Sequence, residues 1–451
     1  MSRRAAARRA CAYLGLWLLG PYADPANGAC VEVAPVACER CFALFVMPDT
    51  QSYTRRSFQP RGAAHLDLVT RYVCRHRERW LEPSTGKTMP ILMLIQLGDL
   101  VHDRNPPGDM GAQLAEWVRV DAAFDRLDAC DPPVPYLVTT GNHDVAGGDY
   151  QGTSEGYNAY FGVERWARQG VQCADPADCD WQAGEYFIGG GDPIAAGSRN
   201  RSGPGEVGPI RSQPGRHRAG VVRVPGGDRL LFLGLEHAFD LPPAAPGREG
   251  LEGDDARWPR WVLDTYSGVP TIVFHHSLFW TYGPGDPRLR FGPEVWGSDS
   301  LTEGSPGEDS TAGMRGLWDR LIAPHRQIFM VFSGHVLKSA TQADFTIARA
   351  EGPPVHGFLR NFQNAGIPGI EDPAHHYGAG WNVVAAFDPE AGEVRVRSYR
   401  IDDHAAHAQP PLHRQRGEPA PTECLDMDWN GVAERVVKWP SRGADQAVGA
   451  P

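Results

Sequence analysis

The sequence lacks any apolar run long enough to cross a lipid bilayer, which takes about 20 residues in a helix. Its N-terminal apolar run covers only residues 10–20 and follows four arginines. This combination is typical of the basic and apolar regions of a secretory signal peptide. We therefore expect a signal or leader segment over residues 1–40, export to a periplasmic or extracellular compartment, and no transmembrane segment; an uncleaved leader is the alternative.

Excess positive charge is also missing. The chain has 44 lysines and arginines against 55 aspartates and glutamates, which gives a net charge of -11. Nucleic-acid backbones and anionic membrane surfaces are bound by clustered positive charge. This balance argues against nucleic acid as the main partner. An acidic substrate would need a local positive centre, for which a metal ion is one candidate.

A second CxxC pair is absent as well. Cys38 and Cys41 have CxxC spacing, but structural zinc sites usually combine two such pairs. A local disulfide, or two free thiols beside the first strand, is therefore expected here rather than zinc. Cys173 and Cys179 flank a short polar loop that a disulfide would close in an oxidising compartment. The nine cysteines fit export without proving it.

Short apolar runs alternate with helix-like stretches along the chain. The sequence predicts buried strands near residues 42–47, 89–97, 134–140, 229–236, 270–277 and 326–334. Helices are expected between several of them, at residues 62–80, 111–127 and 314–322. A β-hairpin is predicted over residues 381–401. This alternation indicates an α/β fold, in which functional residues gather at the carboxyl ends of strands.

Three segments depart from this alternation. Residues 189–218 and 283–313 are rich in turn-forming residues and too long for plain connections, so we interpret them as insertions, which often cover a site. Residues 402–451 are proline-rich and without periodicity, and we expect an irregular C-terminal tail.

Polar side chains follow five of the predicted strands. They are Asp49 and Gln51, then Asp99, then Asn142, His143 and Asp144, then His275 and His276, and finally His335. Singly, each has an ordinary explanation as a turn residue, a helix cap or a hydrogen-bonded histidine. Together, oxygen and imidazole ligands that converge from several strand ends are what a divalent cation requires. The glycines before Asp99, Asn142 and His335 would let the backbone turn with no side chain in the way.

In the same order, the stretches "PDTQ", "LGDLVHD", "TGNHD", "VFHHS" and "SGHVL" resemble the motifs of the calcineurin-like metallophosphoesterases, in particular the subgroup that carries Asp-Thr-Gln. The resemblance covers residues 41–401. It implies one metallophosphoesterase domain, a four-layer α/β/β/α sandwich with two mixed β-sheets. It also implies hydrolysis of a phosphomonoester or phosphodiester by attack of a metal-bound hydroxide.

The resemblance also implies a ligand set for one or two divalent ions, which Mn, Fe, Zn or Mg would suit in differing degrees. Asp99 would bridge both ions. Asp49 and Gln51 would serve the first ion. The second ion would be served by Asn142, His275 and His335.

Two histidine assignments follow from the same family pattern. His143 would not bind metal but would stabilise the transition state or protonate the leaving oxygen, and Asp144 would orient its ring. Adjacent strand residues face opposite ways, so only one of His275 and His276 reaches the ion. The family pattern selects His275 and leaves His276 beside the pocket or packed beneath it.

Two departures from the family pattern weaken the first ion site. Gln51 stands where the family usually has histidine, and Leu337 stands where the second histidine of Gly-His-x-His would be. Either the first ion is loose or another residue completes its site, with candidates His102, His237 and His356, each of which is more ordinarily structural. Lys338 is a candidate phosphate contact, although an exposed lysine is the commoner explanation. The alternative function is a metal- or ligand-binding protein with weak or lost catalysis.

Overall fold

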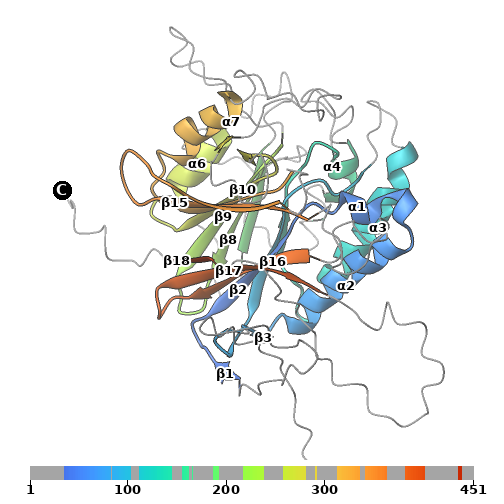
Figure 1. The fold of residues 1–451 in the computed structure, drawn as a ribbon, viewed down its shortest axis with the longest axis horizontal. Helices are drawn as coiled ribbons and strands as arrows, with labels where there is room; N and C mark the ends of the chain where they lie inside the picture. Colours follow the sequence, from blue (N-terminus) through green and yellow to red (C-terminus); the bar gives the residue numbers. More distant parts are fainter. Residues whose placement is uncertain are drawn as a thin grey trace, which may run out of the picture.

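The computed structural model describes residues 35–82, 84–102, 111–144, 155–161, 165, 186–191, 217–237, 257–280, 290–291, 312–335, 341–362, 381–401 and 435–438. It is a mixed α/β fold with two large mixed sheets (Figure 1), which confirms the α/β class expected from the sequence. Several predicted features lie outside the described residues: most of the leader, Cys173 and Cys179, the central parts of both insertions, Leu337 and Lys338. Within the described ranges, no helix is long and apolar enough to cross a membrane.

The first large sheet has six strands, in the order β18-β17-β16-β2-β5-β6. Three of them run parallel: β2 (Phe42–Met47), β5 (Ile91–Gln96) and β6 (Tyr136–Val138). The predicted hairpin forms the antiparallel pair β16 (Trp381–Asp388) and β17 (Glu393–Arg400). Outside this pair lies β18 (Arg435–Lys438), from the tail that the sequence predicted to be irregular. The β-branched pair Val436 and Val437 explains this correction, because Val437 is buried against the sheet and Val436 faces out.

The second large sheet has seven strands, in the order β14-β15-β13-β10-β9-β8-β7. Its four central strands are parallel: β9 (Arg229–Leu235), β10 (Thr271–His275), β13 (Ile328–Ser333) and β15 (Val355–Asn361). The antiparallel outer strands are β7 (Tyr186–Gly191), β8 (His217–Arg223) and β14 (Thr341–Ile347). Both ends of the predicted 189–218 insertion therefore belong to strands. The strand at its first end was not predicted because the sequence of β7 is rich in glycine, which is uncommon in strands.

Helices pack against both sheets (Figure 1). On the six-stranded sheet lie α1 (Gln51–Thr54), a 3₁₀ turn η2 (Arg56–Phe58), α2 (Arg61–His76), α3 (Gly111–Asp128) and α4 (Glu155–Phe161). On the seven-stranded sheet lie α6 (Arg257–Thr265), α7 (Ala312–Leu317) and the π-helix η6 (Trp318–Ile322). Two small sheets complete the described elements: β1 (Val36–Ala37) with β3 (Trp80–Leu81) and β4 (Lys87–Met89), and β11 (Phe279–Trp280) with β12 (Arg290–Phe291).

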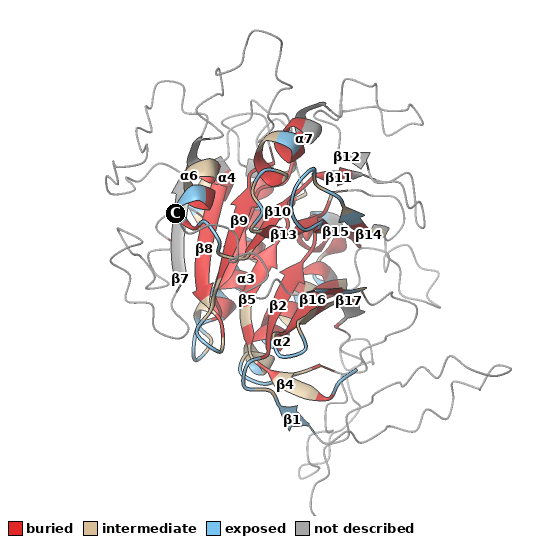
Figure 2. Ribbon diagram, turned by 90° about the vertical axis from the view of Figure 1, so that its left-hand side faces the viewer, coloured by how far each residue is buried: buried red, intermediate tan, exposed pale blue. Residues whose placement is uncertain are grey.

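The central strands of the seven-stranded sheet are buried on both faces. In β10, Ile272 and Phe274 join the hydrophobic cluster that includes β2 and β5, whereas Val273 joins the cluster beneath α6 and α7. All three side chains are fully buried. Figure 2 shows the same pattern, with the central strands of both sheets buried and β1 exposed at the periphery. One apolar core therefore joins the two sheets and brings their strand ends together.

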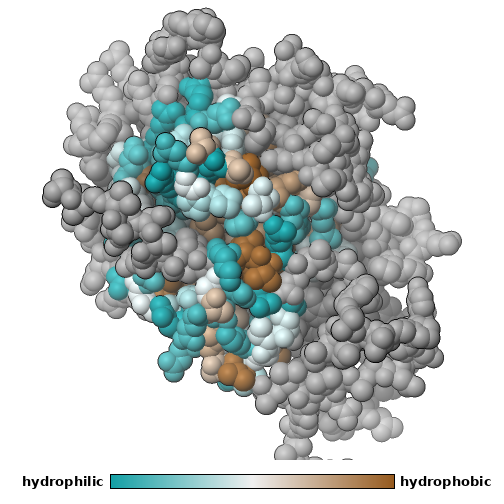
Figure 3. Space-filling model, turned by 60° about the vertical axis from the view of Figure 1, so that its left-hand side comes forward, coloured by the Kyte–Doolittle hydropathy of each residue, from teal (hydrophilic) through white to brown (hydrophobic). Residues whose placement is uncertain are grey.

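The described surface is mostly polar. On the face shown in Figure 3, hydrophilic side chains surround small groups of apolar ones. The described residues with large exposed apolar side chains are Val36, Leu114, Val118 and Val436. Such scattered apolar residues are ordinary on a folded surface.

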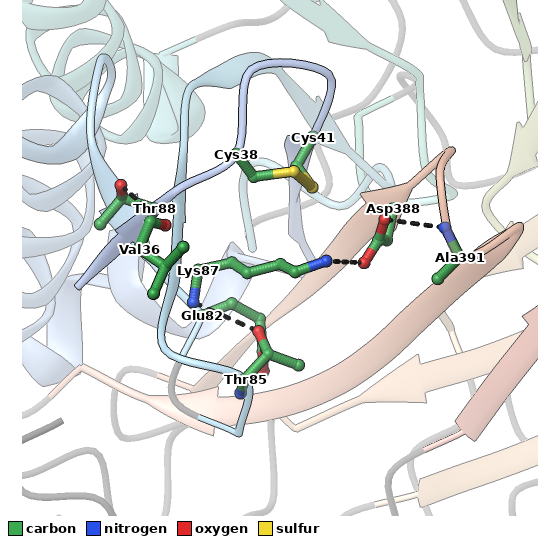
Figure 4. The surroundings of a disulfide bond; sticks show 9 residues. All are labelled: Val36, Cys38, Cys41, Glu82, Thr85, Lys87, Thr88, Asp388 and Ala391. Carbon is green, nitrogen blue, oxygen red and sulfur yellow. Dashed lines mark hydrogen bonds and ion pairs between the residues drawn. A yellow bond between two sulfur atoms is a disulfide. The ribbon is translucent and has the colours of Figure 1, made fainter. Parts of the chain in front are cut away.

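Two disulfides join described residues. Cys38 pairs with Cys41, so the local disulfide expected at the CxxC is formed. Figure 4 shows it beside the ion pair of Lys87 with Asp388, the last residue of β16. The second disulfide joins Cys74 of α2 to Cys130, just after α3, and the sequence spacing alone does not predict this pairing.

Candidate metal centre

Strand ends from both large sheets meet at one rim. From the six-stranded sheet come Asp49 after β2, Asp99 after β5, and Asn142 and His143 after β6. From the seven-stranded sheet come His237 after β9, His276 after β10, His335 after β13 and Asn361 at the end of β15. Backbone hydrogen bonds tie the neighbouring loops together, since Thr50 N–H donates to the Asp99 carbonyl at 3.0 Å. The carboxyl ends of parallel strands therefore place these side chains side by side.

The backbone at the rim is tightly turned. Asp99 has φ +54° and His335 has φ +72°, and among described non-glycine residues only these two have positive φ. Such left-handed conformations cost roughly 1 to 2 kcal/mol each. A Cβ atom on Gly141 would lie 2.2 Å from Asp99 Oδ1, and one on Gly334 would lie 2.2 Å from Asp49 Oδ1. The expectation that these glycines clear the approach to the site is confirmed at both positions.

The centre of the cluster is the Nε2 atom of His276. It lies 3.0 Å from His335 Nδ1, 3.1 Å from Asn142 Oδ1 and 3.3 Å from Asp99 Oδ1. The other ring nitrogen, Nδ1, lies 2.8 Å from the Leu97 carbonyl and must donate to it, because a carbonyl only accepts. Leu97 therefore holds the ring so that Nε2 faces the cluster.

These separations fit a divalent ion. With metal–ligand bonds of about 2.0 to 2.2 Å, neighbouring ligand atoms lie roughly 3.0 to 3.4 Å apart. The distances from His276 Nε2 to His335 Nδ1, Asn142 Oδ1 and Asp99 Oδ1 all meet this spacing. Among the described residues, the ligand atoms of Asp99, His276 and His335 lie within 4.8 Å of one another and suit an ion. The donor set present in the chain therefore fits the metal that the strand-end pattern predicted.

The electrostatics also favour a cation. Burial raises the pKa of Asp49, and the nearby carboxylates of Asp99 and Asp144 raise it further against the opposing effect of His276. Burial lowers the pKa of His276, but Asp99 and Asp49 outweigh it and raise that pKa to about 9. Burial likewise opposes ionisation of Asp99, yet His276 and His143 keep its pKa below its usual value. The opposite pKa shifts of Asp99 and His276 show that each favours the charged form of the other.

Asp49 belongs to the rim but is held by the opposite sheet. Its Oδ2 accepts from the backbone N–H of His335 at 2.8 Å and from Nδ2 of Asn361 at 2.6 Å. Its Oδ1 lies 3.7 Å from His276 Nδ1. Asn361 was not predicted at this rim, which it reaches as the last residue of β15. Gln51 begins α1 with its side chain buried, and its carboxamide stays a predicted ligand.

The histidine after β10 that reaches the cluster is His276, and this corrects the assignment of His275. Side chains alternate along a strand, so His276 lies on the same face as Ile272 and Phe274, toward the six-stranded sheet. The Nδ1 atom of His275 instead accepts from the backbone N–H of Ser277 at 3.1 Å. The prediction that only one of the two rings reaches the site agrees with this geometry.

The ring of His143 is held by a different partner from the one predicted. Its Nδ1 lies 2.5 Å from the His102 carbonyl and donates to it, while its backbone N–H donates to Asp99 Oδ1 at 3.0 Å. Asp144 accepts with both oxygens from backbone N–H groups of Leu100, Val101 and Gly141. The orienting role assigned to Asp144 is thus corrected: this carboxylate shapes the loop because the buried amides there need an acceptor.

Of the three histidines considered for completing the first ion site, His102 and His237 lie near the rim and His356 does not. His356 is the second residue of β15, at the opposite end of that strand from Asn361. His102 stacks on His143 with ring centroids 5.5 Å apart. His237 is buried beside His276 and His335, and burial together with these rings lowers its pKa well below the usual value.

Comparison with solved structures finds remote similarities. No family model matches the sequence, and no curated protein matches it. Among solved structures, the chain is similar to a dimetal phosphatase from Danio rerio, with 12% identity, a TM-score of 0.37, and coverage of 79% of this chain and 95% of that one. It is also similar to GAP50, the anchor in the inner membrane complex of Plasmodium, with 8% identity, a TM-score of 0.35, and coverage of 86% and 92%. With TM-scores this low, neither similarity supports a conclusion about fold or function.

Proposed function

We propose that this protein is a metal-dependent phosphoesterase that hydrolyses a phosphomonoester or phosphodiester. The observation that carries the proposal is the convergence of three donor atoms on His276 Nε2 at 3.0 to 3.3 Å. The two large sheets with their covering helices would then be the four-layer sandwich of the calcineurin-like metallophosphoesterases, in the subgroup that carries Asp-Thr-Gln. Export is part of the same proposal, supported by the basic and apolar N-terminal sequence.

The ligands fall into two groups. Asp99, Asn142, His276 and His335 would hold one divalent ion, and Asp49 and Gln51 would join Asp99 at the other. A bound ion lowers the pKa of a coordinated water and neutralises charge on a phosphate ester. The chain has a net charge of -11, which repels an anionic substrate. The bound cations would supply the local positive charge that such a substrate needs.

His143 is the proposed proton donor. Because its Nδ1–H donates to the His102 carbonyl, the ring presents Nε2 as the atom that exchanges a proton with the leaving oxygen. The backbone N–H of His143 donates to Asp99 Oδ1, so the ring stays next to the proposed bridging carboxylate. This geometry ties the position of the acid to the position of the metal.

A second candidate function is metal binding with weak or lost catalysis. The described acidic and histidine side chains that could hold a metal at this rim form one group, Asp99, His276 and His335, which corresponds to one ion. The other site includes the neutral carboxamide of Gln51, and the leucine at position 337 cannot bind a cation. A protein with one occupied site would bind metal but hydrolyse esters poorly.

Metal analysis and hydrolysis assays separate these functions. We expect the wild type to bind one or two Mn²⁺ ions per chain and to hydrolyse p-nitrophenyl or bis-p-nitrophenyl phosphate only when Mn²⁺ is present. Asp99→Asn should lose both metal and turnover. His143→Ala should keep the metal but lose turnover by about 10² to 10⁴-fold, the usual contribution of a general acid. His356→Ala, at the far end of β15, is the matched control and should behave as the wild type.

The outcomes are distinct. Metal without turnover in the wild type would favour the binding function, whereas a wild type that takes up no metal would refute both. Full activity in His143→Ala would show that another group protonates the leaving oxygen.

A further inference from the structure

Three imidazole rings converge above the end of β10. The ring centroids of His276 and His335 are 4.8 Å apart, those of His237 and His276 are 5.3 Å apart, and those of His237 and His335 are 5.8 Å apart. His237 and His335 follow β9 and β13, which flank β10 on opposite sides. Strands separated by one neighbour lie roughly 9 to 10 Å apart. The two outer rings therefore lean toward each other over the central strand.

The position of His237 is set from both sheets. Its backbone N–H donates to Thr140 Oγ1, in the loop after β6, at 3.1 Å. The residue before Thr140, Thr139, donates from its hydroxyl to the Leu235 carbonyl at the end of β9. The ring Nδ1 of His237 lies 3.2 Å from Ser277 Oγ, next to His276 in the chain. Because Nδ1 meets Ser277, the opposite nitrogen, Nε2, is the atom presented away from it.

These ring separations fit three histidines that bind the same ion. An imidazole nitrogen binds Zn²⁺ at about 2.0 to 2.1 Å, which places the centroids of two rings on one ion roughly 4.5 to 6 Å apart. All three centroid separations fall in this range. The ligand atoms that already lie within 4.8 Å of one another belong to Asp99, His276 and His335, so the His237 ring would move toward them when an ion binds. In addition, metal-bound histidines are usually oriented by a hydrogen bond to the second ring nitrogen. His276 has such a partner in the Leu97 carbonyl, and His237 has one in Ser277.

We propose that His237 is a third imidazole ligand of the ion held by Asp99, His276 and His335. This inference rests on the metal site of the proposed function and identifies the class of ion it takes. With Asp99 and Asn142, three imidazoles give a set of three nitrogens and two oxygens, which favours borderline ions such as Zn²⁺, Co²⁺ or Fe²⁺ over Mg²⁺, an ion that prefers oxygen ligands and retained water. The sequence offered His237 only as a candidate for the first ion, and the ring positions assign it to the ion held by His276 and His335 instead.

The proposal that His237 binds the ion is tested by the metal affinity of a variant that keeps an aromatic ring at this position. His237→Phe keeps a buried ring and removes both nitrogens, and His356→Phe is the matched control on β15. After removal of metal with a chelator, Zn²⁺ affinity is measured by competition with a chromophoric chelator. Loss of an outer-sphere partner usually costs about 10 to 100-fold, so we expect His237→Phe to weaken Zn²⁺ by at least that factor. Mg²⁺ affinity should change far less, and His356→Phe should match the wild type.

Two further measurements do not depend on His237→Phe folding. Ser277→Ala removes only the partner of Nδ1 and should weaken Zn²⁺ by about 10-fold. In the wild type loaded with Co²⁺, proton NMR should show paramagnetically shifted ring protons from three histidines. Shifted protons from two histidines, or unchanged Zn²⁺ affinity in a folded His237→Phe, would overturn the inference.

The inference and the proposed function fail in different ways. A wild type that binds Zn²⁺ through three histidines but hydrolyses no phosphate ester would leave the ligand assignment standing and refute the enzyme. A wild type that hydrolyses esters while His237→Phe keeps full affinity and a wild-type Co²⁺ spectrum would refute the ligand assignment alone.

Discussion

Replacing His276 by alanine should abolish tight metal binding, whereas the same change at His275 should not. The two histidines are adjacent in the chain and both are fully buried, so the pair is matched in sequence position and in exposure. They differ in what their rings contact. His276 Nε2 is the one atom shared by the contacts to His335, Asn142 and Asp99. The His275 ring accepts from the backbone of Ser277 instead.

The expected loss of metal-dependent stabilisation follows from two quantities: the loss of metal affinity, and the ion concentration relative to the dissociation constant. Loss of an outer-sphere partner weakens metal binding by about 10 to 100-fold, so loss of His276 should weaken it by at least about 100-fold. An ion present at 100 times its dissociation constant stabilises the wild type by about 2.7 kcal/mol. At the same concentration, a variant with 100-fold weaker binding gains only about 0.4 kcal/mol. The two proteins should therefore differ by about 2.3 kcal/mol in metal-dependent stabilisation.

Urea denaturation with and without Zn²⁺ or Mn²⁺ measures this difference. Each variant serves as its own metal-free reference, so any loss of packing from the alanine cancels. We expect His275→Ala to keep most of the metal-dependent stabilisation. If His276→Ala kept it and His275→Ala lost it, the cluster around His276 Nε2 would not be the metal site.

Two further predictions concern stability away from the rim. Removing the disulfide with Cys74→Ala and Cys130→Ala should lower the free energy of unfolding by about 4 kcal/mol, because the bond closes a loop with a sequence separation of 56; urea denaturation under oxidising conditions measures the loss. Glu82 is buried, which raises its pKa, but hydrogen bonds from Thr85 and the charge of Arg397 outweigh this and keep the pKa below its ordinary value of 4.5. Its stabilising contribution is therefore fully present above pH 4.5 and is lost as the pH falls through the lower folded-state pKa, so Glu82→Gln should be less stable than the wild type at pH 7, with the gap closing in acid.

Both predictions have internal controls. The Cys38–Cys41 bond closes a loop with a separation of only 3, so its removal should cost about 1.5 kcal/mol. Equal losses from the two disulfides would contradict the loop-length argument. For Glu82, a stability gap to Glu82→Gln that stayed constant from pH 7 to pH 3 would show that its carboxylate charge contributes nothing.

The strand pattern and much of the rim could be predicted from local sequence. The predicted strand at residues 42–47 matches β2, because six consecutive apolar residues end at a proline and then at polar side chains. Asp99 and Asn142 were predicted at the rim because each follows a glycine that ends an apolar run. Such signals are local, since a turn needs only its own residues to adopt its conformation.

Other features depended on contacts between distant segments. The outer strands β7 and β14 were not predicted, because their sequences lack a long apolar run and pair only at the edges of a sheet. The pairing of Cys74 with Cys130 follows from the packing of α2 beside α3, which spacing along the chain does not reveal.

What the sequence by itself determined is the α/β class and a series of metal-type ligands at strand ends. What only the tertiary structure decided is which of those ligands share a point in space. β10 is buried on both faces, with Val273 and Phe274 both inaccessible, so apolar patterning cannot tell which face of β10 meets the other sheet. The choice of His276 over His275, and the approach of His237 and Asn361, is fixed by the packing of one sheet on the other, because that packing alone decides which alternating side chains point inward.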